Sequence, residues 1–196
     1  NAQLFQETQS RAEELVVLNE MGNELSTKLD TKGIAEVIYK YTSRLMDTRF
    51  FFVAIYDEKV SEKSYPIAFE DGLPIELSPT KITGKGFTDH IIRNKKAIFA
   101  PDNVLGHMKA LGIEFVALSE DDTPSQCWLG VPMMIGDRVL GVISVQSVDR
   151  ANVYDEHDRD ILIVTSDSRG SGRVTPFAEK FPEQIVEIGI AEQNMV

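Results

Sequence analysis

Residues 127 to 148 constrain the fold of this chain more than any other stretch, because they hold two apolar runs separated by a short turn. The runs extend from Trp128 to Ile135 and from Val139 to Val148, with Gly136-Asp137-Arg138 between them. Their many β-branched residues favour a pleated, half-buried surface over a helix. Two such runs joined at a Gly-Asp turn are the usual signal of a β-hairpin. We therefore expect two antiparallel strands in the centre of a sheet.

Three residues within this hairpin restrict what surrounds it. Pro132 has no amide hydrogen, so we expect that side of its strand to face an edge or a bulge. Gly130 and Gly141 carry no side chain, and we expect them to leave room for close packing from a neighbouring layer.

The segments before the hairpin alternate between helical and strand patterns. Asp30 or Thr31 is a suitable N-cap for a helix over residues 32–46, where apolar residues recur at helical spacing. The continuous apolar run 50–56 is typical of a strand that is covered on both faces. A second strand is expected over residues 60–69.

Residues 82–126 read as a short helix followed by a long irregular stretch. A turn with two glycines, Gly84 and Gly86, precedes a helix predicted over Phe87–Asn94, and a short strand should follow it. Residues 100–126 contain several Gly, Pro and acidic residues and are expected to form a loop. Loops of this length in a compact domain are often functional.

The first 30 residues are polar with a thin apolar stripe. The stripe is a heptad seam made of Leu4, Thr8, Arg11, Leu15, Leu18, Gly22, Leu25 and Leu29. Such a seam is typical of a helix that pairs with a second copy of itself. The alternative is an amphipathic helix packed on its own domain.

Several of these segments together resemble a GAF domain. The pattern W-L-G-V-P-M, a G-D-R turn and V-L-G-V-I-S-V resemble the last hairpin of this family, and residues 82–99 resemble its G-x-G-hydrophobic helix. The resemblance covers about residues 10–162, and the first 22 residues resemble the helical linker between consecutive GAF domains. It implies an α/β (α+β) fold. A central antiparallel sheet of about six strands would carry helices on one face and ligand-pocket loops on the other.

The resemblance also implies a pocket for a small molecule. Its expected lining consists of the following apolar residues: Phe52, Phe69, Phe87, Ile91, Phe115 and Trp128. The alternative for each of them is plain core packing, because aromatic side chains dominate ordinary cores. The motif of relatives that bind cyclic nucleotides is only partly present, and that of relatives that attach a bilin to a cysteine such as Cys127 is missing.

The last 36 residues resemble a different family. Residues 161–164 look like a buried strand that runs into a Gly/Ser turn, and GIAEQNM resembles a motif of the pyrimidine-binding domain of transketolase-like enzymes. In that family the glutamate, here Glu192, contacts the aminopyrimidine of thiamine diphosphate. Residues 161–196 are too few to enclose that cofactor, so we expect no thiamine-dependent activity. A fusion, a misassembled reading frame and an engineered join would each explain the tail.

Composition excludes several other functions. A net charge of −11 argues against nucleic acid or an anionic membrane as the main partner. No apolar run approaches the roughly 18 residues that a membrane span needs. The single cysteine allows no internal disulfide, which fits a cytoplasmic location. No His, Cys or carboxylate spacing marks a metal site or a nucleophile with its base.

These observations predict a three-part chain. Residues 1–30 form a signalling or coiled-coil helix, residues 31–160 a GAF sensor domain, and residues 161–196 an incomplete transketolase-like fragment. We expect the domain to bind an unknown small-molecule ligand, to form a homodimer through its first helix, and to catalyse nothing and hold no cofactor. A ligand-free dimerisation platform, or a thiamine enzyme recognised through its tail, are the alternatives.

Overall fold

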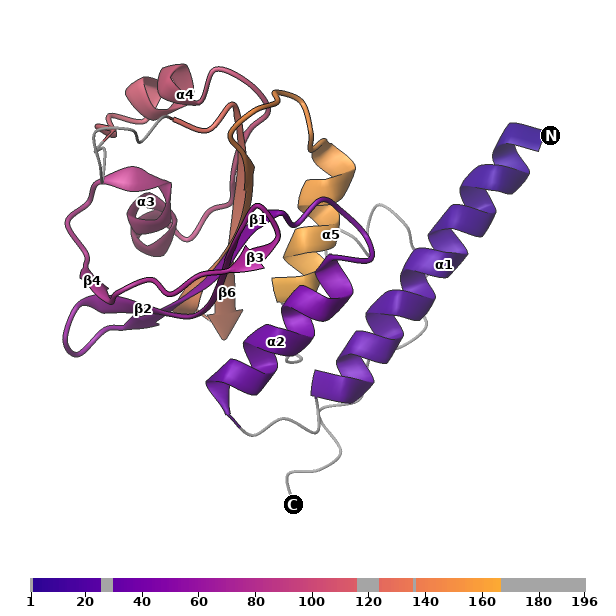
Figure 1. Cartoon of the computed structure of the whole chain (residues 1–196), viewed down its shortest axis with the longest axis horizontal. Coiled ribbons are helices and arrows are strands. Elements are labelled where there is room, and N and C mark those ends of the chain that lie inside the picture. Colours follow the sequence, from indigo (N-terminus) through magenta and orange to yellow (C-terminus); the bar gives the residue numbers. More distant parts are fainter. Residues whose placement is uncertain (1, 26–29, 116–123, 136, 167–196) are drawn as a thin grey trace.

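The computed structural model of the 196-residue chain describes residues 2–25, 30–115, 124–135 and 137–166 (Figure 1). Its centre is an antiparallel sheet in the order β3-β2-β1-β7-β6-β5, with β4 also paired to β2. The strands are β1 (Phe50–Asp57), β2 (Glu62–Glu70), β3 (Leu73–Pro74), β4 (Thr80–Lys81), β5 (Ile98–Ala100), β6 (Cys127–Ile135) and β7 (Arg138–Ser147). The predicted α/β class with a central antiparallel sheet is confirmed.

The hairpin of β6 and β7 lies at the centre of the sheet, as its sequence indicates. β7 pairs with β1 on one edge and β6 on the other. β5 pairs only with residues 128–130, so Pro132 lies beyond its end, at an edge that needs no amide donor. A Cβ on Gly141 would lie 1.9 Å from the Ala54 carbonyl oxygen, so the close neighbour is the adjacent strand rather than another layer.

Helices α2 (Thr31–Thr42) and α5 (Glu156–Ser166) pack on one face of the sheet, and α1 (Ala2–Leu25) lies on their outer side (Figure 1). Asp30 caps α2, as predicted, because its Oδ1 accepts a 2.7 Å hydrogen bond from the Gly33 amide. The C-terminal half of α1 packs on its own domain, with Leu18 and Leu25 buried. At these two seam positions α1 is an amphipathic helix packed on its own domain, which was the alternative to pairing with a second copy.

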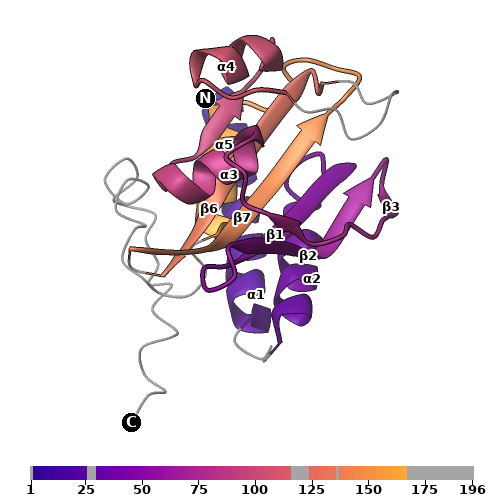
Figure 2. The ribbon, with the colours of Figure 1, turned by 90° about the vertical axis from the view of Figure 1, so that its left-hand side faces the viewer.

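Helices α3 (Gly86–Asn94) and α4 (Val104–Ala110) lie on the opposite face of the sheet (Figure 2). The structure corrects the prediction of an irregular loop over residues 100–126, because α4 forms within it. Asn103 caps this helix by accepting a 3.2 Å hydrogen bond from the Gly106 amide. Asparagine is among the preferred N-cap residues, so a local signal for this helix was present.

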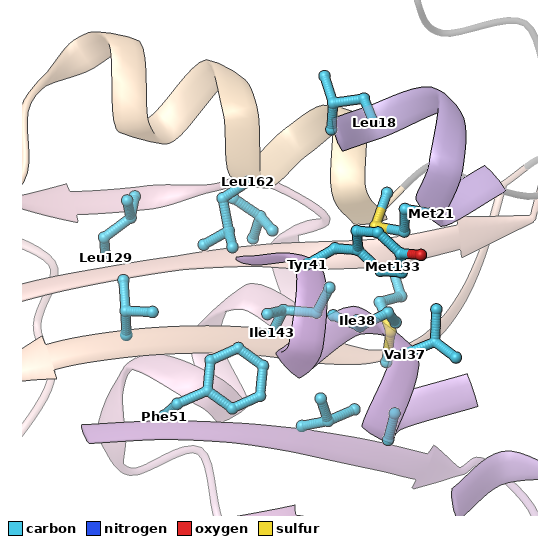
Figure 3. Packing of buried hydrophobic residues seen from close by; sticks show 14 of the residues in the cluster. Leu18, Met21, Val37, Ile38, Tyr41, Phe51, Leu129, Met133, Ile143 and Leu162 are labelled. Atoms are coloured by element: carbon cyan, nitrogen blue, oxygen red, sulfur yellow. The ribbon is translucent and has the colours of Figure 1, made fainter. Parts of the chain in front are cut away.

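Two buried clusters result from this arrangement, one on each face of the sheet. In β1, Phe51 and Val53 join the cluster beneath α1, α2 and α5, here called the helix-side cluster. Phe52 and Ala54 join the other, the cavity-side cluster, because successive strand residues point to opposite faces. Figure 3 shows the helix-side cluster, with the following residues of the three helices over the sheet: Leu18, Met21, Val37, Ile38, Tyr41 and Leu162.

The predicted strand over residues 161–164 is wrong, because α5 continues through them to Ser166. Asp155 starts this helix by accepting hydrogen bonds from the amides of His157 (2.8 Å) and Asp158 (3.0 Å). Leu162 is then fully buried in the helix-side cluster. The remainder of the predicted transketolase-like fragment, with Glu192, lies outside the described residues.

Candidate ligand-binding site

A cavity of about 560 Å³ lies between the sheet and the α3–α4 face. This volume falls within the range of about 300–1,000 Å³ that is typical of small-molecule pockets. Its lining combines aromatic, hydroxyl and amino side chains: Phe50, Phe52, Lys63, Tyr65, Glu70, Thr80, Lys81, Thr83, Lys85, Gly86, Phe87, Thr88, Val104, Met108, Phe115, Pro124, Ser125, Trp128, Gln146 and Val148. The cavity can therefore hold an apolar body and bind polar groups attached to it.

Aromatic rings form much of the apolar lining. The rings of Phe87 in α3 and Trp128 in β6 lie 4.8 Å apart in a tilted arrangement. Phe52 in β1 meets Tyr65 in β2 edge to face, with ring centroids 5.7 Å apart. A Cβ on Gly130 would lie 2.3 Å from the Trp128 ring, so a larger residue there would require this ring to move. These paired rings offer flat surfaces on which a planar ligand can stack.

A buried carboxylate holds residues 83–86, the segment that joins β4 to α3 and borders the cavity. Asp89 is fully buried and pairs with the Lys63 ammonium group, which is 8% exposed. Its other oxygen, Oδ2, accepts hydrogen bonds from the amides of Thr83 (2.8 Å) and Gly84 (2.9 Å). Buried charges are tolerated when they are paired and hydrogen-bonded in this way. The position of the 83–86 segment therefore depends on Asp89.

The remaining polar lining is more exposed. Ser125 Oγ donates a 2.9 Å hydrogen bond to the Gln146 side-chain oxygen. The ammonium group of Lys81 lies 3.3 Å from the carboxylate of Glu62, a residue that does not line the cavity. Lys85, the residue before α3, has its ammonium group 3.7 Å from Glu114. Exposed pairs of this kind are weak and exchange readily with solvent.

Tyr154 lies on the helix side and connects the end of β7 to the segment that leads into β1. Its hydroxyl lies 3.0 Å from the Asp47 carbonyl oxygen and 3.2 Å from that of Gln146. Burial raises the pKa of Tyr154 well above its usual range, with a further contribution from the Asp47 carboxylate. The phenol is therefore neutral at physiological pH and serves as a structural donor.

The structure brings together four of the six residues predicted to bind a ligand. Phe52, Phe87, Phe115 and Trp128 all line the cavity. Ile91 lies deeper in the cavity-side cluster, where it is fully buried and borders no open space of the cavity.

Phe69 is placed on the opposite face of the sheet, so its assignment to this lining is wrong. It pairs directly with Phe51 across β1 and β2, and residues directly opposite each other share a face. Its ring stacks on Tyr39 of α2 with centroids 3.8 Å apart. Strand pairing decides the face, and the pairing register of β2 could not be read from its mixed sequence.

Lys63 and Asp89 form a buried ion pair at the site that the sequence analysis missed, as it missed the other polar residues of the lining. The signal was weak, since an acidic residue in the first turn of a helix usually interacts with the helix dipole at the surface. A lysine in a strand likewise usually faces solvent. Only the pairing of β2 with β1 and β4 places Lys63 beneath α3.

The residues considered for catalysis or metal binding are dispersed. Cys127 is fully buried in the helix-side cluster, away from the cavity. His157 Nε2 lies 3.1 Å from the Glu14 carboxylate, between α5 and α1. Within the described ranges, no group of three or more His, Cys, Asp or Glu side chains could hold a metal ion.

The family profile described as GAF domain matches residues 28–168 of this sequence. The chain therefore belongs to the GAF domain family. The short segment resembling a second family is also found: 39 residues, 20% of this chain, are 54% identical to one component of the apulose-4-phosphate transketolase of Phocaeicola vulgatus. The chain spans only 12% of the length of that curated relative.

Solved structures with the same fold include signalling proteins and an enzyme. The GAF domain of an Acinetobacter phosphoenolpyruvate-protein phosphotransferase has a TM-score of 0.62 at 15% identity, covering 85% of this chain and 94% of that one. Residues 122 to 287 of a methyl-accepting chemotaxis protein give 0.63 at 10% identity, covering 76% and 91%. Free methionine-R-sulfoxide reductase from Neisseria meningitidis, in complex with its substrate, gives 0.54 at 15% identity, covering 78% and 83%.

These likenesses establish the fold and leave the ligand open. GAF domains are commonly sensory or regulatory, and the structural relatives include signalling proteins. None of the helices in the described part of the chain is both long and apolar enough to cross a membrane.

Proposed function

We propose that this GAF domain is the small-molecule-sensing regulatory module of a cytoplasmic signalling protein, and that it relays ligand binding through a helical dimer. The observation that carries the proposal is the cavity of about 560 Å³ on the α3–α4 face, with paired aromatic rings and several polar side chains in its lining. A cytoplasmic location is supported by the single cysteine, because the chain can form no internal disulfide.

Binding without catalysis is supported by the chemistry of the lining. One structural relative is a methionine sulfoxide reductase, and reduction by thiols needs an accessible thiolate. The one cysteine here, Cys127, is fully buried on the other side of the sheet. Among the described residues, the cavity lining contains no histidine, and Glu70, which is exposed, supplies the one carboxylate there.

The relay is supported by the contacts that fix α1 to the domain. Arg44, just beyond α2, pairs with Glu20 at 2.6 Å, and Tyr41 of α2 donates a 2.8 Å hydrogen bond to Glu24. α1 therefore rests on helices that pack directly on the sheet whose other face lines the cavity. A ligand that shifts the central strands would move the surface on which α1 lies.

Native mass spectrometry of the full chain, purified gently from cells, tests the sensing proposal first. We expect a dimer that carries one small molecule per copy, identified by its mass after denaturation. An empty dimer would favour a ligand-free dimerisation platform and would count against sensing. A thiamine diphosphate adduct would overturn the proposal in favour of the transketolase-like segment.

A matched pair of substitutions tests the role of α1 in the dimer. Val16 on α1 is 56% exposed, and Val60, at the β1–β2 turn, is 52% exposed. Placing a charge in a helix interface is costly. Val16→Glu should therefore raise the dissociation constant of the dimer, measured by light scattering, at least about tenfold. Val60→Glu should leave it unchanged. Equal behaviour of the two variants would remove α1 from the interface.

A further inference from the structure

We propose that the cavity selects a small anion with a flat apolar body, such as an aromatic carboxylate or phosphate. This inference rests on the proposed sensing function and names the chemical class of its ligand. The contrast in charge is the first observation. The whole chain carries a net charge of −11, yet among the residues that the structure describes three lysines and one carboxylate, that of Glu70, line the cavity.

Lys63 provides a buried positive group at the cavity surface. It is 8% exposed, and its ammonium group has three N–H donors. Within the described part of the chain, Asp89 is the one acceptor bonded to this group. Lys63 also lines the cavity, and a buried donor is stabilised by an acceptor, most strongly by an ionised one. A carboxylate or phosphate oxygen of the ligand meets this requirement.

Lys81 and Lys85 provide mobile positive groups at the more exposed part of the lining. Lys81 pairs with Glu62 and donates a 3.0 Å hydrogen bond to the Val60 carbonyl oxygen, and Lys85 pairs with Glu114, whose side chain is 81% exposed. None of these three partners lines the cavity. Pairs at 3.3 and 3.7 Å between such exposed side chains are weak. Both ammonium groups can therefore turn from a solvated partner toward an anion held in the cavity, where screening by water is lower.

The aromatic pairs define the rest of the ligand. Phe87 with Trp128, and Phe52 with Tyr65, present ring faces and edges from three strands and one helix. A planar apolar group gains stacking contacts on such surfaces, whereas a fully hydrated anion such as inorganic phosphate gains none. Anion and aromatic body together therefore form the preferred ligand.

Two fluorescent probes with the same aromatic rings separate the charge from the apolar body. The first, 1-anilinonaphthalene-8-sulfonate, is anionic, and the second, N-phenyl-1-naphthylamine, is neutral. Trp128 is the only tryptophan in the chain and lines the cavity, so energy transfer from it reports binding at this site. Titrations use the full chain, the double variant Lys81→Gln/Lys85→Gln, and the control Lys59→Gln/Lys96→Gln, whose lysines are exposed and outside the lining.

We expect the Lys81/Lys85 variant to bind the anionic probe about tenfold more weakly, since each exposed charge contributes up to about fivefold. The neutral probe should change less than about twofold, the control variant should match the wild type, and added salt should weaken only the anionic probe. Equal effects on both probes, or none on the anionic one, would overturn the anion preference and leave the sensing proposal standing. Absence of energy transfer from Trp128 with either probe would overturn both.

Discussion

Replacement of Asp89 by asparagine is the most direct test of how the cavity wall is held. Asparagine preserves the size of the side chain and keeps one oxygen for the amides of Thr83 and Gly84. It removes the negative charge beside Lys63, which is 8% exposed. The variant therefore leaves a nearly buried ammonium group without its counter-charge while changing little else.

The expected loss of stability follows from the burial of this pair. Removing one partner of a buried ion pair costs about 3–5 kcal/mol. Lys63 borders the cavity, where water can solvate part of the unpaired charge, so we expect the lower end, about 3 kcal/mol. For a chain of this size, that loss corresponds to a fall of roughly 6–12 °C in the unfolding temperature.

Chemical unfolding followed by circular dichroism measures this loss, with Glu62→Gln as the matched control. Glu62 also pairs with a lysine, Lys81, but both side chains are substantially exposed. The same carboxylate-to-amide change should there cost less than about 1 kcal/mol. A loss below about 1 kcal/mol for Asp89→Asn, or an equal loss for both variants, would refute the view that Asp89 anchors the wall of the cavity.

The remaining predictions concern two glycines and one tyrosine. Gly141→Ala should cost about 3 kcal/mol or more, because its Cβ would lie 1.9 Å from the Ala54 carbonyl oxygen. A Cβ on Gly22 meets nothing within 4 Å, so Gly22→Ala should stabilise α1 by up to about 1 kcal/mol. Denaturant unfolding of both variants measures the two changes in stability. Tyr154→Phe should cost about 1 kcal/mol at neutral pH through its lost hydrogen bond. Because burial raises the pKa of Tyr154, its contribution is complete below the unfolded value of about 10 and is lost as pH rises further, so unfolding free energy above that pH should fall more steeply for wild type than for the phenylalanine variant.

Local patterns predicted the central elements well. The apolar runs on either side of the Gly-Asp turn became β6 and β7, within one residue of their predicted ends. β-branched residues at these positions leave few alternatives, since a helix would place them on every side. The cap of α2 at Asp30 was equally readable, because it depends on one side chain and its neighbouring amides.

Features that depend on distant contacts were not readable from the sequence. The face to which Phe69 points depends on its pairing with Phe51, and β1 and β2 change register between Val53 and Ile55. The burial of Lys63 depends on Asp89, which is 26 residues further along the chain. Residues 161–164 form an apolar run too short for periodicity to separate strand from helix, and packing of Leu162 against the sheet decides the outcome.

The alternation along β1 has a consequence for how such a module can be altered. Phe52 and Ala54 belong to the cavity-side cluster, while Phe51 and Val53 belong to the cluster beneath the helices. Substitutions at Phe52 and Ala54 can change ligand preference while the surface on which α1 packs stays intact. Substitutions at Phe51 and Val53 can change that surface while the ligand preference stays intact. An insertion of one residue would exchange the two sets. Recognition and output can thus be re-engineered separately by substitution, whereas changes in length belong in the loops.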